Sequence, residues 1–419
     1  MAHRNAFIQE LDACIDIGMR LVQGASGFAK TQIPDKRFKG DALAHLVRAP
    51  LSTIYSAEAN GRLPAPDRGG KDGDGSRLGY TFAQAFHAMD VLGTRPGRKR
   101  DFDDQPVTIS FTNFKGGCWK TTTSWYFSSW LGSQGYRVLA VDLDPQASLT
   151  RNFSYFPDLD TNFDTTMAPF IMEEVDISYD AVKAVIRPTH LPTVDLLPSS
   201  LDLQGVEWAL ASAVMEEPDI RGKLRYFMRV GEVIAAVADD YDIIVLDGTP
   251  SLGLLPMNII VASNSVIVPV PTEIVDFHST MAFLRLVRTH FAGLIDIFGD
   301  DLPVPQMLYL PTRFNASAST GTASQKILDD YIVPTFEKAL VAGREGAIRK
   351  HDAVVGRLTP FCRTAFDAPP AVGDVRKEYI EKACENYGEI FKAILEQAVF
   401  PTWESMAISR EASGAKVAT

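Results

Sequence analysis

The sequence predicts an α/β protein in which a doubly wound, mostly parallel β-sheet follows an N-terminal α-helical winged helix-turn-helix domain. Two patterns support this fold class. From residue 106 onward, short apolar runs alternate with longer helical patterns, which is typical of parallel strands covered by helices on both faces. Between residues 40 and 95, two short helical patterns flank a tight turn, as in a helix-turn-helix.

A chain of 419 residues is too long for one ordinary domain, and these patterns divide it. The amphipathic pattern of residues 5–24 predicts a helix that is equally consistent with packing within the chain and with dimerisation of the N-terminal unit. We expect an N-terminal helical dimerisation segment at 1–38, a winged helix-turn-helix DNA-binding domain at 39–98, a linker at 99–106, the α/β domain at 107–402 and a flexible tail at 403–419.

The net charge of −11 is unevenly distributed along the chain. Residues 1–100 carry 15 Lys and Arg against 10 Asp and Glu, a balance of +5, so the remainder carries −16. A basic head on an acidic body suggests that the head meets nucleic acid.

The cysteine pattern excludes several classes of protein. Cys14, Cys118, Cys362 and Cys384 are far apart and form no CxxC pair, which argues against a zinc site, an iron–sulfur cluster or a disulfide framework. The longest apolar stretch, near 258–270, is too short to span a bilayer. We therefore expect a cytoplasmic protein without a membrane partner.

The N-terminal unit predicts three helices. DALAHLV (41–47) is followed by a break at Pro50, after which LSTIYSAEANG starts a second helix with Ser52 or Thr53 as its cap. TFAQAFHAMDVLG (81–93) predicts the third. The Gly-, Pro- and Asp-rich stretch between the second and third helices predicts a loop that carries basic residues, as a DNA-contacting wing does.

The α/β domain predicts six strands and at least four helices. The strands are VTISF (107–111), RVLAVD (137–142), TVDLLP (193–198), DIIVLD (242–247), SVIVPV (265–270) and QMLYLP (306–311). The helices are expected near 121–134, 226–238, 280–291 and 324–328, with a long terminal helix over 376–399.

The first motif is the glycine-rich loop in ISFTNFKGGCWKTTTSW, which follows a strand and opens a helix. Backbone N–H groups in such a loop face a phosphate. Lys120 is placed to neutralise phosphates, and the Thr121 hydroxyl is placed to bind Mg²⁺. Phe114 and Trp119 occupy the two glycine positions of the ordinary P-loop pattern.

Two further motifs follow strands. VDLDPQAS (141–148) places Asp142 near Mg²⁺ and Asp144 where a carboxylate would polarise an attacking water. YDIIVLDGTPSLG (241–253) matches a Walker-B strand, with Asp247 holding Mg²⁺ through water. As isolated features, these segments are also consistent with an Asp-Pro turn and a buried strand with a capping Asp.

The three motifs in this order resemble the ParA/MinD family of deviant Walker A ATPases, whose loop reads K-G-G-x-G-K-T. The resemblance implies a homodimer with ATP and Mg²⁺, slow ATP hydrolysis, and Lys115, Lys120 and Asp144 as catalytic residues. The metal would be held by Thr121, Asp142 and Asp247. The nucleotide contacts would come from Lys115, Gly116, Gly117, Cys118, Trp119, Lys120, Thr121, Thr122, Asp142 and Asp247.

In that family the early lysine, here Lys115, reaches across the dimer to the partner's ATP. This chain departs from the family pattern at Trp119, where some backbones need a positive φ, and at Thr249, which replaces a proline. A ParB-like centromere-binding protein would stimulate hydrolysis, and the ATP-bound dimer would hold non-specific DNA on the nucleoid.

The N-terminal unit is similar to the winged helix-turn-helix of the long plasmid-partition ParA subclass, which represses its own operon. Arg48 departs from it at a turn position usually given to glycine. The resemblance and the basic character predict DNA contacts by Ser52, Thr53, Tyr55, Arg62, Arg77, Arg313, Arg357 and Arg363. The alternative for this unit is a helical dimerisation domain without DNA contact.

Rival functions remain open at this stage. One is a nucleotide-sensing transcriptional repressor with little hydrolysis. Another is a MinD-like membrane switch, which the small polar C-terminal sequence disfavours. Whether the cargo is a plasmid or a chromosome depends on the partner protein.

Overall fold

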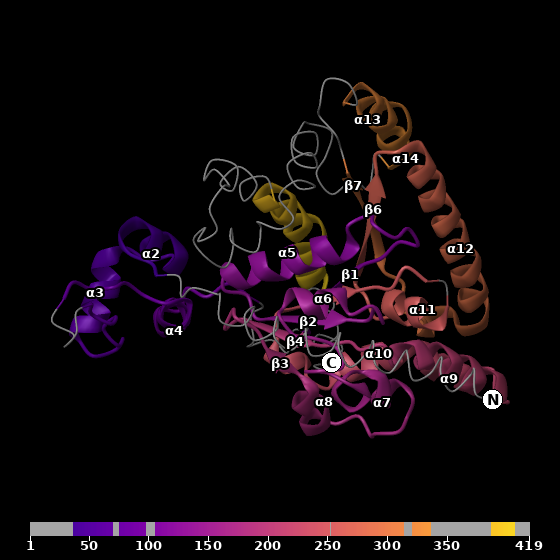
Figure 1. The fold of residues 1–419 in the computed structure, drawn as a ribbon, viewed down its shortest axis with the longest axis horizontal. Helices are drawn as coiled ribbons and strands as arrows, with labels where there is room; N and C mark the ends of the chain where they lie inside the picture. Colours follow the sequence, from indigo (N-terminus) through magenta and orange to yellow (C-terminus); the bar gives the residue numbers. More distant parts are fainter. Residues whose placement is uncertain are drawn as a thin grey trace, which may run out of the picture.

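The structure is a computed structural model that describes residues 37–69, 75–97, 105–251, 253–313, 321–336 and 387–406. Figure 1 shows a central sheet flanked by helices, with a small helical unit at one side. The amphipathic segment 5–24 and the predicted DNA contacts Arg357 and Arg363 lie outside the described residues.

A seven-stranded sheet forms the centre of the described chain, in the order β3-β4-β2-β5-β1-β6-β7. All pairings are parallel except that of β3 with β4. The strands are β1 (Val107–Phe111), β2 (Val138–Asp142), β3 (Arg187–Pro188), β4 (Val194–Leu197), β5 (Ile243–Asp247), β6 (Ser265–Pro271) and β7 (Gln306–Thr312).

The six predicted strands are confirmed to within one residue at each end. They were predictable because both faces of each are covered, so that β1, β2 and β5 are buried along their whole length. The edge strand β3 was missed, since it has only two residues and Pro188 cannot donate a ladder hydrogen bond.

Helices cover both faces of the sheet, as the alternating pattern predicted (Figure 1). One face packs against α5 and the C-terminal helix of residues 387–406, and the other against α7 to α11, with α12 over β6 and β7. The helices of this domain are α5 (Lys120–Ser133), α6 (Ser148–Asn152), α7 (Ala168–Ile171), α8 (Tyr179–Val185), α9 (Leu203–Glu216), α10 (Arg225–Ala235), α11 (Leu254–Val261), α12 (Ile274–Phe298), α13 (Gly321–Ile327) and α14 (Val333–Phe336).

Two predicted helices extend beyond their expected ends. The helix predicted over 280–291 is α12, which begins at Ile274. The helix predicted over 376–399 is described from 387 and continues to 406 through a π-helical turn, Leu395–Val399. Trp403 in its last turns lies with its ring centroid 6.5 Å from that of Tyr136, so packed structure extends past residue 402.

The N-terminal unit contains α2 (Gly40–Val47), α3 (Leu51–Ala59) and α4 (Phe82–Leu92) around its own apolar core. Helix α4 starts with a capping box at Thr81 and ends at a left-handed Gly93. The expected capping of α3 by Ser52 or Thr53 is wrong, because the helix begins at Leu51 and no side chain caps it.

Two antiparallel bridges order the N-terminal unit. Arg68 pairs with Arg77 within the loop between α3 and α4, and Phe38, which precedes α2, pairs with Tyr80 at the end of that loop. These isolated bridges do not test the prediction of a DNA-contacting wing.

The N-terminal unit is bonded to the C-terminal end of α5. Arg48, at φ 56° in the turn between α2 and α3, donates from Nη2 to the Gln134 carbonyl at 3.3 Å. Arg95 donates to the Gly135 carbonyl at 3.2 Å and also to the Phe86 carbonyl. The residue at the turn position usually given to glycine is thus used for a contact between the two units.

No helix in the described ranges is long and apolar enough to cross a membrane.

Candidate functional site

The glycine-rich loop connects the interior strand β1 to α5 at the carboxyl edge of the sheet. Gly117 has φ 73° and Trp119, the residue before the helix, has φ 71°. The expectation that residue 119 stands where positive φ is needed is therefore confirmed. A left-handed conformation costs a non-glycine residue about 1 kcal/mol, and the half-buried Trp119 side chain packs against the core, which offsets this cost.

Three polar residues that sequence reasoning missed anchor this loop. The Asn113 amide donates to the Pro269 carbonyl at 2.7 Å and to Thr280 Oγ1 at 3.1 Å. Thr312 Oγ1, at the end of β7, donates to the Cys118 carbonyl at 3.2 Å. These bonds join segments more than 150 residues apart, so no local pattern signals them.

Lys120 is buried at the start of α5. Its Nζ donates to the Lys115 carbonyl at 3.1 Å, which folds the loop over the ammonium group. Gly116 and Gly117 leave open space where a Cβ would stand, so the backbone of the loop is accessible on that side. An open glycine backbone around a buried lysine suits a phosphate group.

Lys115 extends away from Lys120 toward α12. Its Nζ lies 3.0 Å from Asp276 Oδ1, and Asp276 is buried. Arg313 contacts the same carboxylate at 3.1 Å and Glu273 at 3.0 Å. Arg313, which was predicted to bind DNA, is therefore engaged by two carboxylates beside the loop.

Asp247 ends β5 next to the loop, in register with Phe111 of β1 and Asp142 of β2. Ser124 Oγ donates to its Oδ1 at 2.9 Å, whereas its buried Oδ2 has no hydrogen-bond partner among the described residues. Burial raises the pKa of Asp247 to about 8, and the hydroxyls of Thr121 and Ser124 oppose that rise.

An unpaired buried carboxylate oxygen near the Thr121 hydroxyl suits a cation. The described residues contain no group of three or more His, Cys, Asp and Glu that could hold a metal alone. Mg²⁺ fits such a site, because it usually keeps waters and phosphate oxygens beside one or two protein ligands.

Asp142 organises the second motif. Its Oδ2 accepts from the Thr150 backbone at 2.8 Å and from Thr150 Oγ1 at 2.7 Å, and its Oδ1 accepts from the Asp144 backbone at 3.1 Å. Burial raises its pKa to about 7, against the hydrogen bonds from Thr150. Asp142 thus fixes the position of Asp144.

Asp144 has one occupied carboxylate oxygen, which accepts from the Gln146 backbone at 2.9 Å. Burial raises the pKa of Asp144, while that backbone bond and the charge of Lys120 lower it. Asp144 lines a pocket of about 390 Å³ with residues of α9 and with Thr249 and Pro250 of the loop after β5. A small polar reactant such as water fits beside it.

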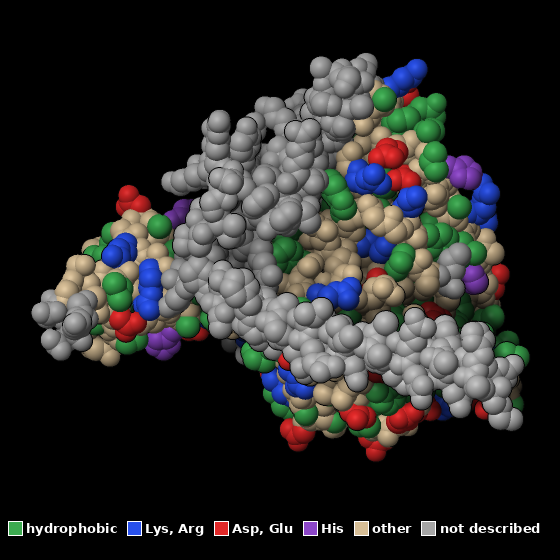
Figure 2. Space-filling view, in the orientation of Figure 1, with side chains coloured by type: hydrophobic (Ala, Val, Ile, Leu, Met, Phe, Trp, Pro, Cys, Tyr) green, Lys and Arg blue, Asp and Glu red, His purple; other side chains and the backbone are tan. Residues whose placement is uncertain are grey.

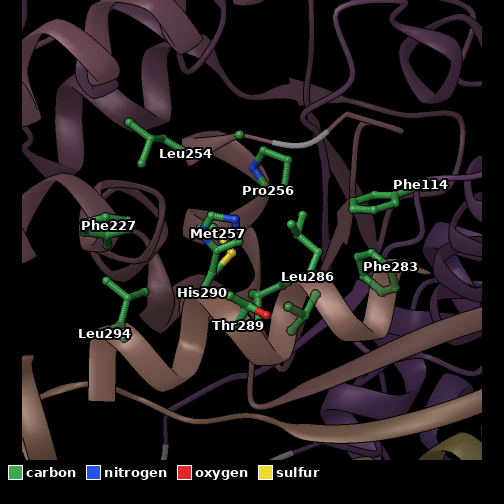
Figure 3. A pocket seen from close by; sticks show the side chains of 14 residues that line it. Phe114, Phe227, Leu254, Pro256, Met257, Phe283, Leu286, Thr289, His290 and Leu294 are labelled. Atoms are coloured by element: carbon green, nitrogen blue, oxygen red, sulfur yellow. The ribbon is translucent and has the colours of Figure 1, made fainter. Parts of the chain in front are cut away.

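A second pocket of about 520 Å³ lies between α11 and α12 (Figure 3). Its lining is mainly apolar, including Phe114, Met257 and Phe283, with Thr289 and His290 as polar groups. Phe114, at an ordinary glycine position of the P-loop, packs its ring edge-on against Phe283 at 4.8 Å. That residue therefore fixes the loop to α12 rather than facing a phosphate.

The predicted DNA contacts of the N-terminal unit have mixed surroundings. Ser52, Thr53 and Tyr55 are exposed on α3. Arg62 donates to the Val91 carbonyl at 3.0 Å, and Arg77 pairs with Glu58. Figure 2 shows Lys and Arg of this unit interspersed with Asp and Glu.

Comparisons with known proteins agree with this geometry. A family model described as an AAA domain matches residues 107–291. Protein SopA of Escherichia coli (strain K12) is 32% identical over 329 residues, which cover 76% of this chain and 81% of SopA. The sporulation initiation inhibitor protein Soj of Bacillus subtilis (strain 168) is 32% identical over 180 residues, 43% of this chain and 64% of Soj.

A solved structure described as Partition Protein resembles the fold across nearly the whole chain. It covers 94% of this chain and 97% of its own, with a TM-score of 0.61 and 18% identity. At that identity the likeness shows the fold alone.

Proposed function

Because the chain belongs to the ParA/MinD-type P-loop ATPases of the plasmid-partition type, we propose that it is an ATP-dependent dimerisation switch for DNA partition. The observation that supports this most is the division of labour between two lysines in one loop. Lys120 is buried inside the loop, whereas Lys115 points out of it to a counter-ion on α12.

ATP with Mg²⁺ is the ligand of this site. The open backbone at Gly116 and Gly117 and the ammonium group of Lys120 would hold the phosphates. Thr121 and the unpaired Oδ2 of Asp247 would hold the metal, which supplies charge neutralisation on the phosphate oxygens. Cys118, Trp119 and Thr122 would contribute main-chain and steric contacts.

Asp144 is the residue we assign to hydrolysis. Asp142 holds its backbone, Gln146 holds one carboxylate oxygen, and Asp144 lines the pocket that it shares with the loop after β5. A carboxylate in that position accepts a hydrogen bond from water and aims it at the terminal phosphate. The proposed hydrolysis yields ADP and phosphate and is slow without a partner.

Lys115 is the residue we assign to dimerisation. About a third of its side chain is exposed, and among the described residues its ammonium group pairs with Asp276 of its own chain. A partner's triphosphate presents more negative charge than one carboxylate, so the ammonium group would exchange Asp276 for it when two chains meet. ATP would then join two copies of the chain.

The N-terminal unit is the proposed winged helix-turn-helix, at 39–98, and α3 its recognition helix. The exposed face with Ser52, Thr53 and Tyr55 would enter the major groove, with Arg62 and Arg77 at the phosphates. Arg48 bonds this unit to one end of α5, and Lys120 lies at the other end of that helix. Helix α5 therefore connects the proposed DNA-binding unit to the proposed nucleotide site. Repression of its own operon is part of this proposal.

The test of the proposal is ATP hydrolysis measured with DNA and a ParB-like centromere-binding protein from the same genetic locus. We expect slow turnover by the chain alone and clear stimulation when both are present. Fast turnover by the chain alone would contradict a switch. Operator binding that responds to ATP, without stimulated hydrolysis, would favour the second candidate, a nucleotide-sensing repressor.

A further inference from the structure

Helix α9 exposes a large apolar surface beside the nucleotide site. Trp208 is 81% exposed and Met215 is 83% exposed, and their spacing of seven residues places them on the same side of the helix. Leu201, just before the helix, is 53% exposed. The opposite side of α9 is buried against α7, α10 and α11, so the exposed side is a second apolar face of the helix.

The Trp208 end of this surface is continuous with the catalytic pocket. Trp208 lines the same pocket as Asp144 and Thr249. The neighbouring Glu207 accepts hydrogen bonds from the backbone N–H groups of Leu254 and Leu255, at 2.9 and 3.1 Å. These bonds fix α9 to the start of α11. A protein that binds over Trp208 would therefore also cover this side of the pocket.

A second exposed apolar group lies at the start of α12, on the Lys115 side of the site. Ile274 is 49% exposed and Val275 is 69% exposed, directly before Asp276. These residues follow the carboxyl end of β6, as Leu201 follows the carboxyl end of β4. Apolar surface thus lies on both sides of a polar site, along one edge of the sheet.

We propose that these two apolar groups, Leu201, Trp208 and Met215 on one side and Ile274 and Val275 on the other, are the surface on which a second copy of this chain docks. The inference rests on the proposed function, in which the second chain's Lys115 must reach the nucleotide held beside Asp144. Trp208 lines the pocket that also contains Asp144, so a chain docked over Trp208 would stand beside the proposed nucleotide.

The size of a stable interface favours the use of both groups. A stable pair of proteins buries about 1,200–2,000 Å² in total, whereas one aromatic side chain supplies about 200 Å². Tryptophan is also enriched among the few residues that carry most of the binding energy. Trp208 is therefore the residue whose removal should weaken the dimer most.

The experiment compares Trp208→Ala with Val304→Ala by sedimentation velocity, in Mg²⁺ and a non-hydrolysable ATP analogue. Val304 is 65% exposed but precedes β7, at the opposite edge of the sheet. We expect Trp208→Ala to weaken the nucleotide-dependent dimer by about 30-fold or more and Val304→Ala to leave it unchanged. Nucleotide binding by dilute, monomeric Trp208→Ala protein serves as the control for folding.

Wild-type affinity in Trp208→Ala would overturn the inference and leave the proposed function intact. A wild-type chain that stays monomeric with the analogue would contradict both. Trp208→Phe, which keeps an aromatic ring, should retain most of the affinity; if instead it and Trp208→Ala both equal wild type, another surface joins the two copies.

Discussion

Lys115 Nζ and Asp276 Oδ1 lie 3.0 Å apart within one chain, although they come from the phosphate-binding loop and from a helix that starts 159 residues later, at Ile274. Asp276 also pairs with Arg313. One buried carboxylate therefore holds two cations at the edge of the site. We interpret it as the counter-ion that Lys115 leaves when the dimer forms.

Replacing Asp276 with Asn should favour the dimer. The substitution removes the ion pair that the ammonium group of Lys115 must break within its own chain before it can bind the partner's nucleotide. We expect the nucleotide-dependent dimer to tighten by about fivefold, the equivalent of a partly exposed ion pair of about 1 kcal/mol. Sedimentation velocity in Mg²⁺ and an ATP analogue measures this, with Asp300→Asn as an exposed control. A weaker dimer would show that Asp276 orients Lys115 instead.

Substitutions at Trp119 should separate backbone strain from packing. Both Trp119→Gly and Trp119→Ala lose the half-buried ring, but only glycine adopts φ 71° without strain. We expect the glycine variant to be more stable than the alanine variant by about 1 kcal/mol in free energy of unfolding, measured with urea. Equal stability would mean that the loop changes conformation when the indole is removed.

Cys118 should react slowly with alkylating reagents. Burial raises the pKa of its thiol above the ordinary value of about 9, against the nearby charge of Lys120. Since only the thiolate reacts, alkylation of the folded protein at pH 8 should be much slower than that of the urea-unfolded protein, and should increase as the pH rises further. Peptide mass spectrometry with iodoacetamide measures it. Equal rates in both states would contradict a closed loop.

Arg95 should couple the unfolding of the N-terminal unit to that of the domain that contains the sheet. Its guanidinium donates to the carbonyls of Phe86 and Gly135 and pairs with Asp90. We expect Arg95→Ala to lower the free energy of unfolding by about 1–3 kcal/mol and to separate the thermal transitions of the two units. Lys223→Ala, in the short turn before α10, is a basic control away from this contact. A single thermal transition at the wild-type temperature would mean that other contacts hold the two units together.

The sequence predicted those parts of the molecule that local patterns encode. Every strand of four or more residues could be read from its apolar run, and the positions of Lys120, Asp144 and Asp247 followed from the order of motifs. Helix α11 was missed because it is apolar on all sides and so lacks helical periodicity. Helix α9 was missed because it exposes apolar residues on the side where polar ones are expected.

The contacts between distant segments could not be predicted. Asn113, Thr312 and Asp276 act through partners more than 150 residues away, and a single sequence contains no signal for such pairs. Arg48 and Trp119 were noticed only as departures from a family pattern. The structure gives both a role, since each adopts a left-handed conformation and makes a contact that glycine could not.

The most direct test of the central claim compares Lys115→Ala with Lys120→Ala for binding of an ATP analogue and for dimerisation in Mg²⁺. We predict that Lys120→Ala loses about 10–100-fold in nucleotide affinity, whereas Lys115→Ala binds the nucleotide as a monomer and does not dimerise. A Lys115→Ala chain that dimerises like the wild type would contradict the proposal that this lysine joins two copies through ATP.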